Sequence, residues 1–192
     1  MFQAGAAVRE AFFGNAAEAR RAANAALELS KSRDVEYGAS FALAMSGDTT
    51  AAQTVAGDLE EKFPEDTCVR FTYLPINRAL LALNQHDASA ALEQLQAAAP
   101  YELGVPCSWF GYFGNLYAPY VRGEAYLAAH RYAEAAGEFQ KILDHPGIVF
   151  IDPVWIAAHL QLARGFAAGA DTTKAKAAYQ DLLNAQAGRG TV

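Results

Sequence analysis

The chain has 192 residues, 53% of them hydrophobic, and a formal net charge of −6 at pH 7. This acidic balance, with a pI near 5.2, argues against a nucleic-acid groove, because phosphate binding requires clustered Lys and Arg. Charged or amide residues interrupt each apolar stretch well before the roughly 20 residues that a membrane-spanning helix needs. We therefore expect no nucleic-acid partner, and no membrane insertion by this segment.

Ala, Leu, Glu, Gln, Lys and Arg supply much of the chain, and these residues have the best helix propensities. The sequence therefore predicts an all-α fold, treated as a single helical-repeat domain over 1–192. We expect helical hairpins at about 1–32, 33–66, 70–100, 115–146 and 154–187.

One turn position recurs along the chain and marks where the first helix of each hairpin gives way to the second. The gaps between successive copies are 33, 39, 44 and 40 residues. Most copies offer a glycine that can end a helix or a polar side chain that can cap the next one. The copies are Asn15, Asp48, Asp87, Arg131 and Asp171.

Two stretches interrupt this period. Residues 101–114 contain Pro106, several glycines and several aromatics, so we expect an irregular insertion that packs back onto the helices. Residues 144–153 hold an apolar run, Ile148 to Ile151, between two prolines. This run suggests a short extended segment tucked between hairpins.

A set of four residues occurs twice with the same offsets of three, twelve and sixteen. In each copy, small residues on two helices allow the helices to approach closely, while large aromatics fill the space beside them. Each hairpin would leave an apolar face that a neighbouring hairpin covers. The two copies are Gly123, Tyr126, Ala135 and Phe139, then Ala163, Phe166, Ala175 and Tyr179.

Residues that could bind metals or act as nucleophiles form no recognisable site. Cys68 and Cys107 lie 39 residues apart without CxxC spacing, which indicates neither a zinc site nor a disulfide framework. Each cysteine is most simply a small buried apolar residue, although one disulfide stays open if the chain is extracytoplasmic. The four histidines have no metal-ligand spacing. We expect no cofactor, no metal and no enzymatic activity.

The repeated set, followed by Ile142, Leu143 and Pro146, resembles the signature of the tetratricopeptide repeat (TPR). A second copy ending in Leu182 and Leu183 resembles it equally well. The resemblance implies a right-handed α-solenoid of about five TPR-like hairpins.

Longer stretches resemble a narrower group. The segments KFPEDT from Lys62, AAAPYELG from Ala97 and EFQKILDHPGIV from Glu138 are similar to the repeat region that follows the kinase domain in acidobacterial eukaryotic-like serine/threonine protein kinases. This implies a sensor or docking segment of a signalling protein. No kinase motif occurs in the chain, so the resemblance implies no kinase activity here.

Members of the TPR family bind ligands along a concave groove lined by the first helix of each hairpin. Aromatics mixed with amides and charges suit a peptide groove, although each Tyr could instead serve only in packing between hairpins. On this chain the resemblance places in the groove Tyr37, Phe41, Tyr73, Asn77, Tyr117, Tyr120, Glu124, Gln161 and Arg164.

The leading functional prediction is a non-catalytic protein-interaction module that binds a protein or peptide partner of unknown identity. The alternative is a self-association or structural spacer domain, forming a homodimer through the solenoid ends or the aromatic segment 101–120. A small-molecule sensor would need a closed apolar pocket near the insertion, with Arg122 or Arg164 facing inward. The localisation would be cytoplasmic by default, or extracytoplasmic after a membrane helix in a longer parent protein.

Overall fold

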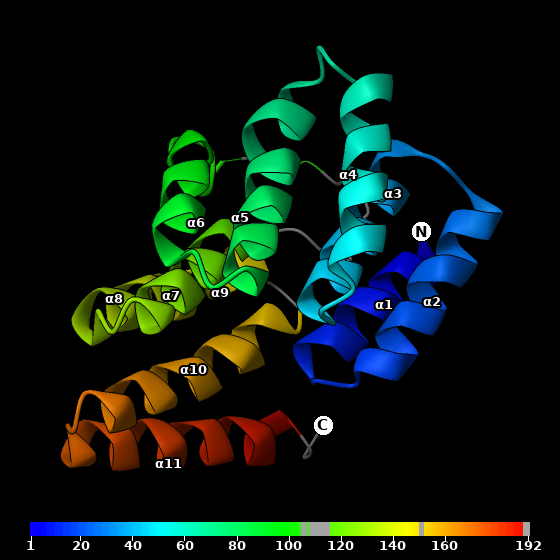
Figure 1. The fold of residues 1–192 in the computed structure, drawn as a ribbon. Helices are drawn as coiled ribbons and strands as arrows, with labels where there is room; N and C mark the ends of the chain where they lie inside the picture. Colours follow the sequence, from blue (N-terminus) through cyan, green and yellow to red (C-terminus); the bar gives the residue numbers. More distant parts are fainter. Residues whose placement is uncertain (105–106, 108–115, 150–151, 190–192) are drawn as a thin grey trace.

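The fold is known from a computed structural model, which describes residues 1–104, 107, 116–149 and 152–189. Within these residues the secondary structure is entirely helical, with no β-strand. The all-α prediction is confirmed. Figure 1 shows the helices packed in neighbouring pairs that follow a curved path, with α1 and α2 at the right, α4 and α5 at the top and α11 at the bottom of the view.

The described helices form five consecutive pairs, and short helical segments flank the third and fourth. The pairs are α1 (Phe2–Phe12) with α2 (Ala16–Leu29), α3 (Arg33–Met45) with α4 (Thr49–Lys62), α5 (Leu74–Asn84) with α6 (Ala88–Gln94), α7 (Tyr117–Ala128) with α8 (Tyr132–Leu143), and α10 (Val154–Ala168) with α11 (Thr172–Arg189). A π-helical turn, η1 (Val69–Tyr73), leads into α5, a 3-10 turn, η2 (Leu95–Ala97), follows α6, and α9 (Pro146–Val149) follows α8.

The turn inside each pair is built in the same way five times. One residue adopts a left-handed backbone, and the N–H of the next residue donates to the carbonyl five positions earlier, as in Asp48 N to Leu43 O at 2.9 Å. Asp48, Asp87 and Asp171 also cap the following helix through a side-chain oxygen. The left-handed residues are Gly14, Gly47, His86, His130 and Ala170.

Small residues set the spacing within the pairs. A Cβ atom added to Gly123 would lie 2.6 Å from the ring of Phe139, so α7 and α8 approach as closely as a glycine allows. Ala135, opposite on α8, and Phe139 are fully buried. This is the contact that the repeated spacing predicts.

The first helices of successive pairs also contact one another. Helix α1 packs on α3, α3 on α5, α5 on α7, and α7 on α10. The side chains that these helices direct toward one another fill the interior of the molecule. The right-handed solenoid sense and the TPR-like identity of the hairpins stay predictions.

Two sequence-based expectations need correction. Cys68 and Cys107 are not separate buried thiols, because they form a disulfide that ties η1 to the connection after η2. The run from Ile148 does not begin as an extended segment, since Ile148 and Val149 lie in α9. Phe150 and Ile151, which complete the run, lie outside the described residues.

Candidate functional site

The predicted groove residues lie on the first helices of the pairs, except Tyr73, which ends η1 just before α5, and most of them are buried. Six side chains are at most 3% exposed and form no surface: Tyr37, Phe41, Tyr73, Asn77, Tyr117 and Tyr120. Glu124 and Gln161 are partly buried, and Arg164 is exposed. The five aromatics among the predicted residues pack inside the protein, which is the alternative to a role in lining a groove.

The buried aromatics form a continuous cluster across three pairs. The rings of Tyr37 and Tyr73 stack in parallel with centroids 3.8 Å apart. Tyr37 also contacts Phe41, whose ring lies 4.7 Å from that of Tyr117. Aromatic pairs at these distances add to the stability gained from burial. This cluster, which we call the aromatic row, therefore joins α3, η1 and α7 into one core.

Phe12, which the groove prediction omits, completes this cluster from α1. Its ring lies 5.1 Å from both Tyr117 and Tyr120, edge-on in each case. More than one hundred residues separate these partners in the sequence, so no local pattern links them. The sequence signal that could have indicated Phe12 is its position, two residues before Gly14 in the turn of the first pair.

Buried hydroxyls in the cluster are bonded to carboxylates. The Tyr73 hydroxyl donates to Asp34 Oδ1, and the Tyr117 hydroxyl donates to Asp152 Oδ2, each at 2.9 Å. Burial raises the pKa of Asp152 to about 7, against the lowering effect of its bonds from the Val154 N–H and Tyr117. These contacts anchor the core and leave little room for a ligand.

A polar group lies where the row reaches α10. Gln161 Nε2 donates to the Tyr120 hydroxyl across 3.5 Å, and this hydroxyl is also bonded to the Glu124 carboxylate. Arg164, one turn further along α10, interacts with the Glu124 charge. We call Tyr120, Glu124, Gln161 and Arg164 the polar end of the row.

Glu124 is the unusual member of the polar end. Its Oε1 atom is buried and has no hydrogen-bond partner among the described residues. Burial raises the pKa of Glu124 to about 7, although the Tyr120 hydroxyl and Arg164 act in the opposite direction. An unsatisfied buried acceptor costs about 1–3 kcal/mol, so a donor that reached Oε1 would be stabilised there.

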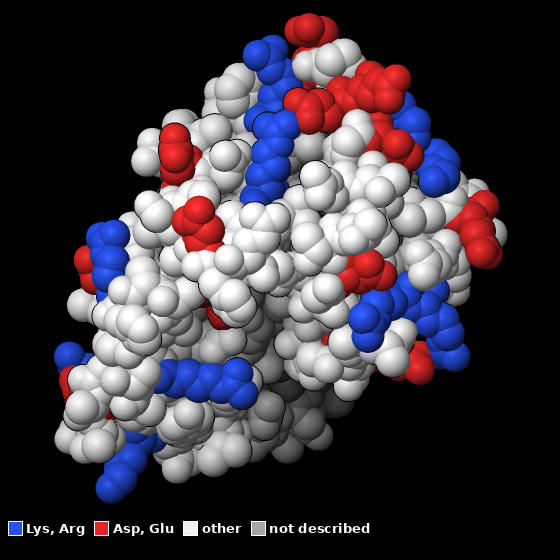
Figure 2. All heavy atoms as spheres, in the orientation of Figure 1, with Lys and Arg blue, Asp and Glu red and all other residues white. Residues whose placement is uncertain are grey.

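Figure 2 shows a hollow at the centre of one face, between α1 and α10, with both signs of charge interspersed around it.

Asn77 is a further unsatisfied group in the interior. Its Nδ2 and Oδ1 atoms are buried without a hydrogen-bond partner in the described part of the chain. The interior thus has unused hydrogen-bonding capacity on both α5 and α7.

A second charged cluster connects α7 and α8 to the connection after η2. Arg122 binds Glu102 at 2.9 Å and Glu138 at 2.8 Å, and Lys141 binds both carboxylates as well. The four charges balance, and the side chains of Arg122 and Glu102 are only 10% and 7% exposed. This cluster holds the connection in place.

The described residues contain no group of three or more His, Cys, Asp or Glu side chains that could hold a metal ion. No helix among them combines the length and apolar character needed to cross a membrane. Comparison with protein-family models, curated proteins and solved structures found no match to the chain. The TPR and kinase-associated resemblances therefore stay predictions.

Proposed function

We propose that the protein is a non-catalytic interaction module that docks a partner peptide at the polar end of the row. The observation that carries the proposal is the buried Oε1 atom of Glu124, which lacks a hydrogen-bond partner among the described residues. A bound peptide could supply this donor from a backbone N–H or a Lys side chain. Because Oε1 is covered in the free protein, side chains at the polar end would have to move to admit the donor, while the packed core behind them stays in place.

The other polar-end residues would give such a site its selectivity. Arg164 is exposed and can pair with an acidic residue of the peptide. The Gln161 amide donates a long hydrogen bond to the Tyr120 hydroxyl and so links α10 to α7 at this position. A cation or N–H for Glu124 and a carboxylate for Arg164 define a peptide that carries both kinds of group.

The biological setting that we propose for this peptide is a signalling chain. The resemblance of three segments to the region after the kinase domain of bacterial eukaryotic-like kinases supports a docking or sensor role. Because the chain lacks kinase motifs, the proposed activity is binding without turnover.

Selection from a random peptide library displayed on phage would test this proposal. Peptides selected on the wild-type protein should lose at least tenfold in affinity for the Arg164→Glu and Glu124→Ala variants. Arg21→Glu is the matched control, because Arg21 is exposed on α2, far along the sequence from the polar end. Equal affinity for all four proteins would contradict the proposed site.

Self-association is the second candidate, and exposed apolar side chains at both ends of the chain favour it. Phe2 and Leu29, on the first pair, are 83% and 77% exposed, and Leu183 on α11 is 58% exposed. Such side chains can form a head-to-tail contact between copies. The aromatics first considered as dimer anchors, Trp109, Phe110, Tyr112 and Phe113, lie outside the described residues.

Sedimentation velocity over a hundredfold range of concentration separates the two candidates. A mass that rises with concentration and falls back in a Leu183→Glu variant would favour self-association. A constant monomer mass together with selected peptides would favour docking.

A further inference from the structure

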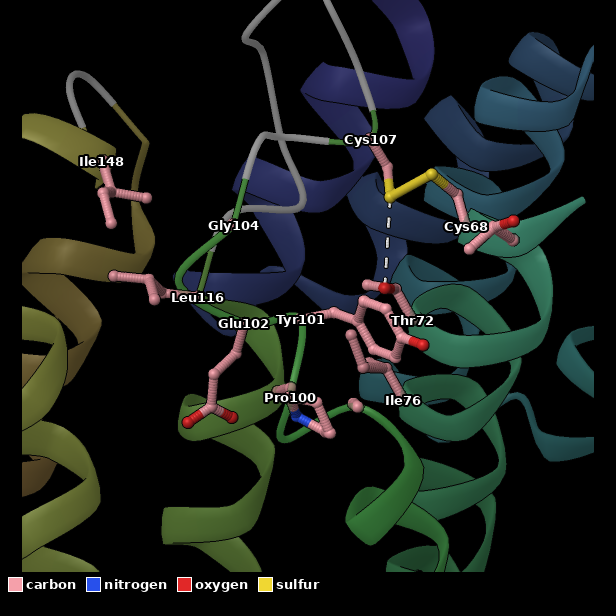
Figure 3. A pocket seen from close by; sticks show the side chains of 13 residues that line it. Cys68, Thr72, Ile76, Pro100, Tyr101, Glu102, Gly104, Cys107, Leu116 and Ile148 are labelled. Carbon is pink, nitrogen blue, oxygen red and sulfur yellow. Dashed lines mark hydrogen bonds between the residues drawn. A yellow bond between two sulfur atoms is a disulfide. The ribbon is translucent and has the colours of Figure 1, made fainter.

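A cavity of about 260 Å³ lies beside the disulfide, and none of the four residues of the polar end lines it. Figure 3 shows its walls: the Cys68–Cys107 bond along one side, Thr72 and Ile76 from the η1–α5 helix, Tyr101 from the connection after η2, and Leu116 with Ile148 opposite. Thr67, Tyr101 and Gly104 are exposed at its edge, so the cavity opens to solvent.

The helix that lines this cavity has an irregular turn there. Thr72 belongs to η1, a five-residue π-helical turn, and such turns occur frequently at functional sites. The ring of Phe71, in the same turn, stacks on that of Tyr101 with centroids 5.2 Å apart. The π turn and the connection after η2 are therefore joined by ring contact as well as by the disulfide.

The disulfide wall is fixed from a third direction. Arg33 on α3 donates to the Cys107 carbonyl at 2.9 Å and pairs with Asp66, two residues before Cys68. Because one side chain holds both sides of the bridge, the wall is preorganised.

Charges near the cavity are already neutralised. Glu102 is the one charged residue among the described residues that line the cavity, and Figure 3 shows its carboxylate directed away from Thr72 and Tyr101. That carboxylate pairs with Arg122 and Lys141. Arg33 is paired with Asp34 and Asp66. An anionic or cationic ligand would therefore find no uncompensated partner in the described lining.

What remains is an apolar lining with hydroxyl groups. The Thr72 hydroxyl lies 4.0 Å from Cys107 Sγ, a weak contact that leaves its lone pairs able to accept a hydrogen bond. Ile76, Leu116 and Ile148 offer apolar surface. An engineered apolar cavity of about 150 Å³ holds benzene, so this larger cavity has room for a substituted ring.

We propose that this cavity is a binding site for a small neutral molecule consisting of an apolar ring and one hydrogen-bonding group. The ring packs against Ile76 and Leu116, and the polar group meets the Thr72 hydroxyl. The disulfide keeps the opposite wall in place, so binding depends on the Cys68–Cys107 bond. The site is separate from the polar end of the row and does not require the docking function.

Three probes of one size and different charge test the proposal: 2-phenylethanol, phenylacetate and 2-phenylethylamine. Each is titrated into ¹⁵N-labelled protein while amide chemical shifts are followed. We expect 2-phenylethanol to shift amides in residues 67–76 and 98–104, with both charged probes at least tenfold weaker. Equal binding of a charged probe, no shifts with 2-phenylethanol, or shifts confined to other regions would overturn the proposal.

Substitutions then locate the site independently. Thr72→Phe should weaken 2-phenylethanol binding at least tenfold by filling the cavity, while Thr54→Phe on the exposed surface of α4 should not change it. Circular dichroism verifies that each variant is folded. If Thr72→Phe does not fold, the milder Thr72→Val should weaken binding about fivefold by removing the hydroxyl.

The disulfide is tested with a Cys68→Ser, Cys107→Ser double variant, for which we expect at least tenfold weaker 2-phenylethanol binding. Wild-type affinity in both the folded Thr72 variant and the disulfide variant would overturn the proposal. Arg164→Glu should leave 2-phenylethanol binding unchanged, which separates this site from the proposed docking site.

Discussion

The fourth and fifth helical pairs share the same residue spacing but bury it differently. In the α7–α8 pair Phe139 is fully buried, whereas the equivalent Tyr179 in the α10–α11 pair is 39% exposed. Helix α8 packs against both α7 and α10, while α11 packs against α10. The spacing thus specifies contact within a pair, and the following pair supplies the remaining burial.

The largest expected effect uses this difference directly. Phe139→Ala should lower the free energy of unfolding by about 3–5 kcal/mol, because it leaves a cavity between three helices. Tyr179→Ala should cost less than about 1 kcal/mol, because the ring is already partly exposed. Urea unfolding followed by circular dichroism measures both. Similar losses for the two variants would show that α11 is as well covered as α8.

The pairs also differ at the position before the small residue, where α7 has Arg122 and α10 has the apolar Leu162. We expect Arg122→Leu to cost about 3 kcal/mol, since it leaves Glu102 and Glu138 buried with one remaining cation. The double variant Arg122→Leu, Glu102→Gln should recover part of this loss. Arg21→Leu on the exposed face of α2 should change stability by less than about 0.5 kcal/mol, and an equal loss there would contradict this interpretation.

Close approach of the helices in the α7–α8 pair can be tested with a matched pair of glycines. Gly123→Ala should cost about 1–3 kcal/mol, because the new methyl group meets the Phe139 ring. Gly137→Ala on α8, where the added Cβ has open space, should stabilise the protein by up to about 1 kcal/mol through helix propensity. Thermal denaturation measures the change in melting temperature of each variant. Changes of the same sign in the two variants would contradict the close approach of α7 and α8.

A pH-dependent effect concerns Glu124, whose place in the fifth pair is taken by Arg164. The folded-state pKa of Glu124 is raised from 4.5 to about 7, so the folded protein binds more protons than the unfolded chain between these values. Stability should therefore fall as pH rises from about 4.5 to about 7 and then level off.

Glu124→Gln keeps an acceptor for Tyr120 and removes the titration. The variant should be more stable than wild type by up to about 3 kcal/mol at pH 8 and nearly equal at pH 4. Melting temperatures measured across this range provide the comparison. A variant that is less stable at pH 8 would show that the charged carboxylate is well compensated.

Local features of this fold could be predicted from the sequence, and long-range ones could not. Asp48, Asp87 and Asp171 cap helices at positions that their residue types and spacing already indicated. The contact of Gly123 with Phe139 was likewise encoded by size and offset. In contrast, the pairing of Cys68 with Cys107 depends on how the connection after η2 folds back onto η1, and no spacing rule describes that path.

The candidate site was less accessible to sequence reasoning than the fold. Repeat positions identified which residues point inward from the first helices, but they could not tell an open groove from a packed core. Phe12 decides this point, because it reaches Tyr117 and Tyr120 from α1 and closes the aromatic row. The unsatisfied Glu124 oxygen emerged only from its burial and its neighbours in three dimensions.

The most direct test of the proposed docking site is the pKa of Glu124 itself, measured by NMR titration of its ¹³C-labelled carboxyl group. The measurement is made on the free protein and with a saturating selected peptide. The account predicts a pKa near 7 in the free protein and a lower value in the complex, because a peptide donor at Oε1 favours the charged form. An unchanged pKa in a saturated complex would place the peptide elsewhere and contradict the proposed function.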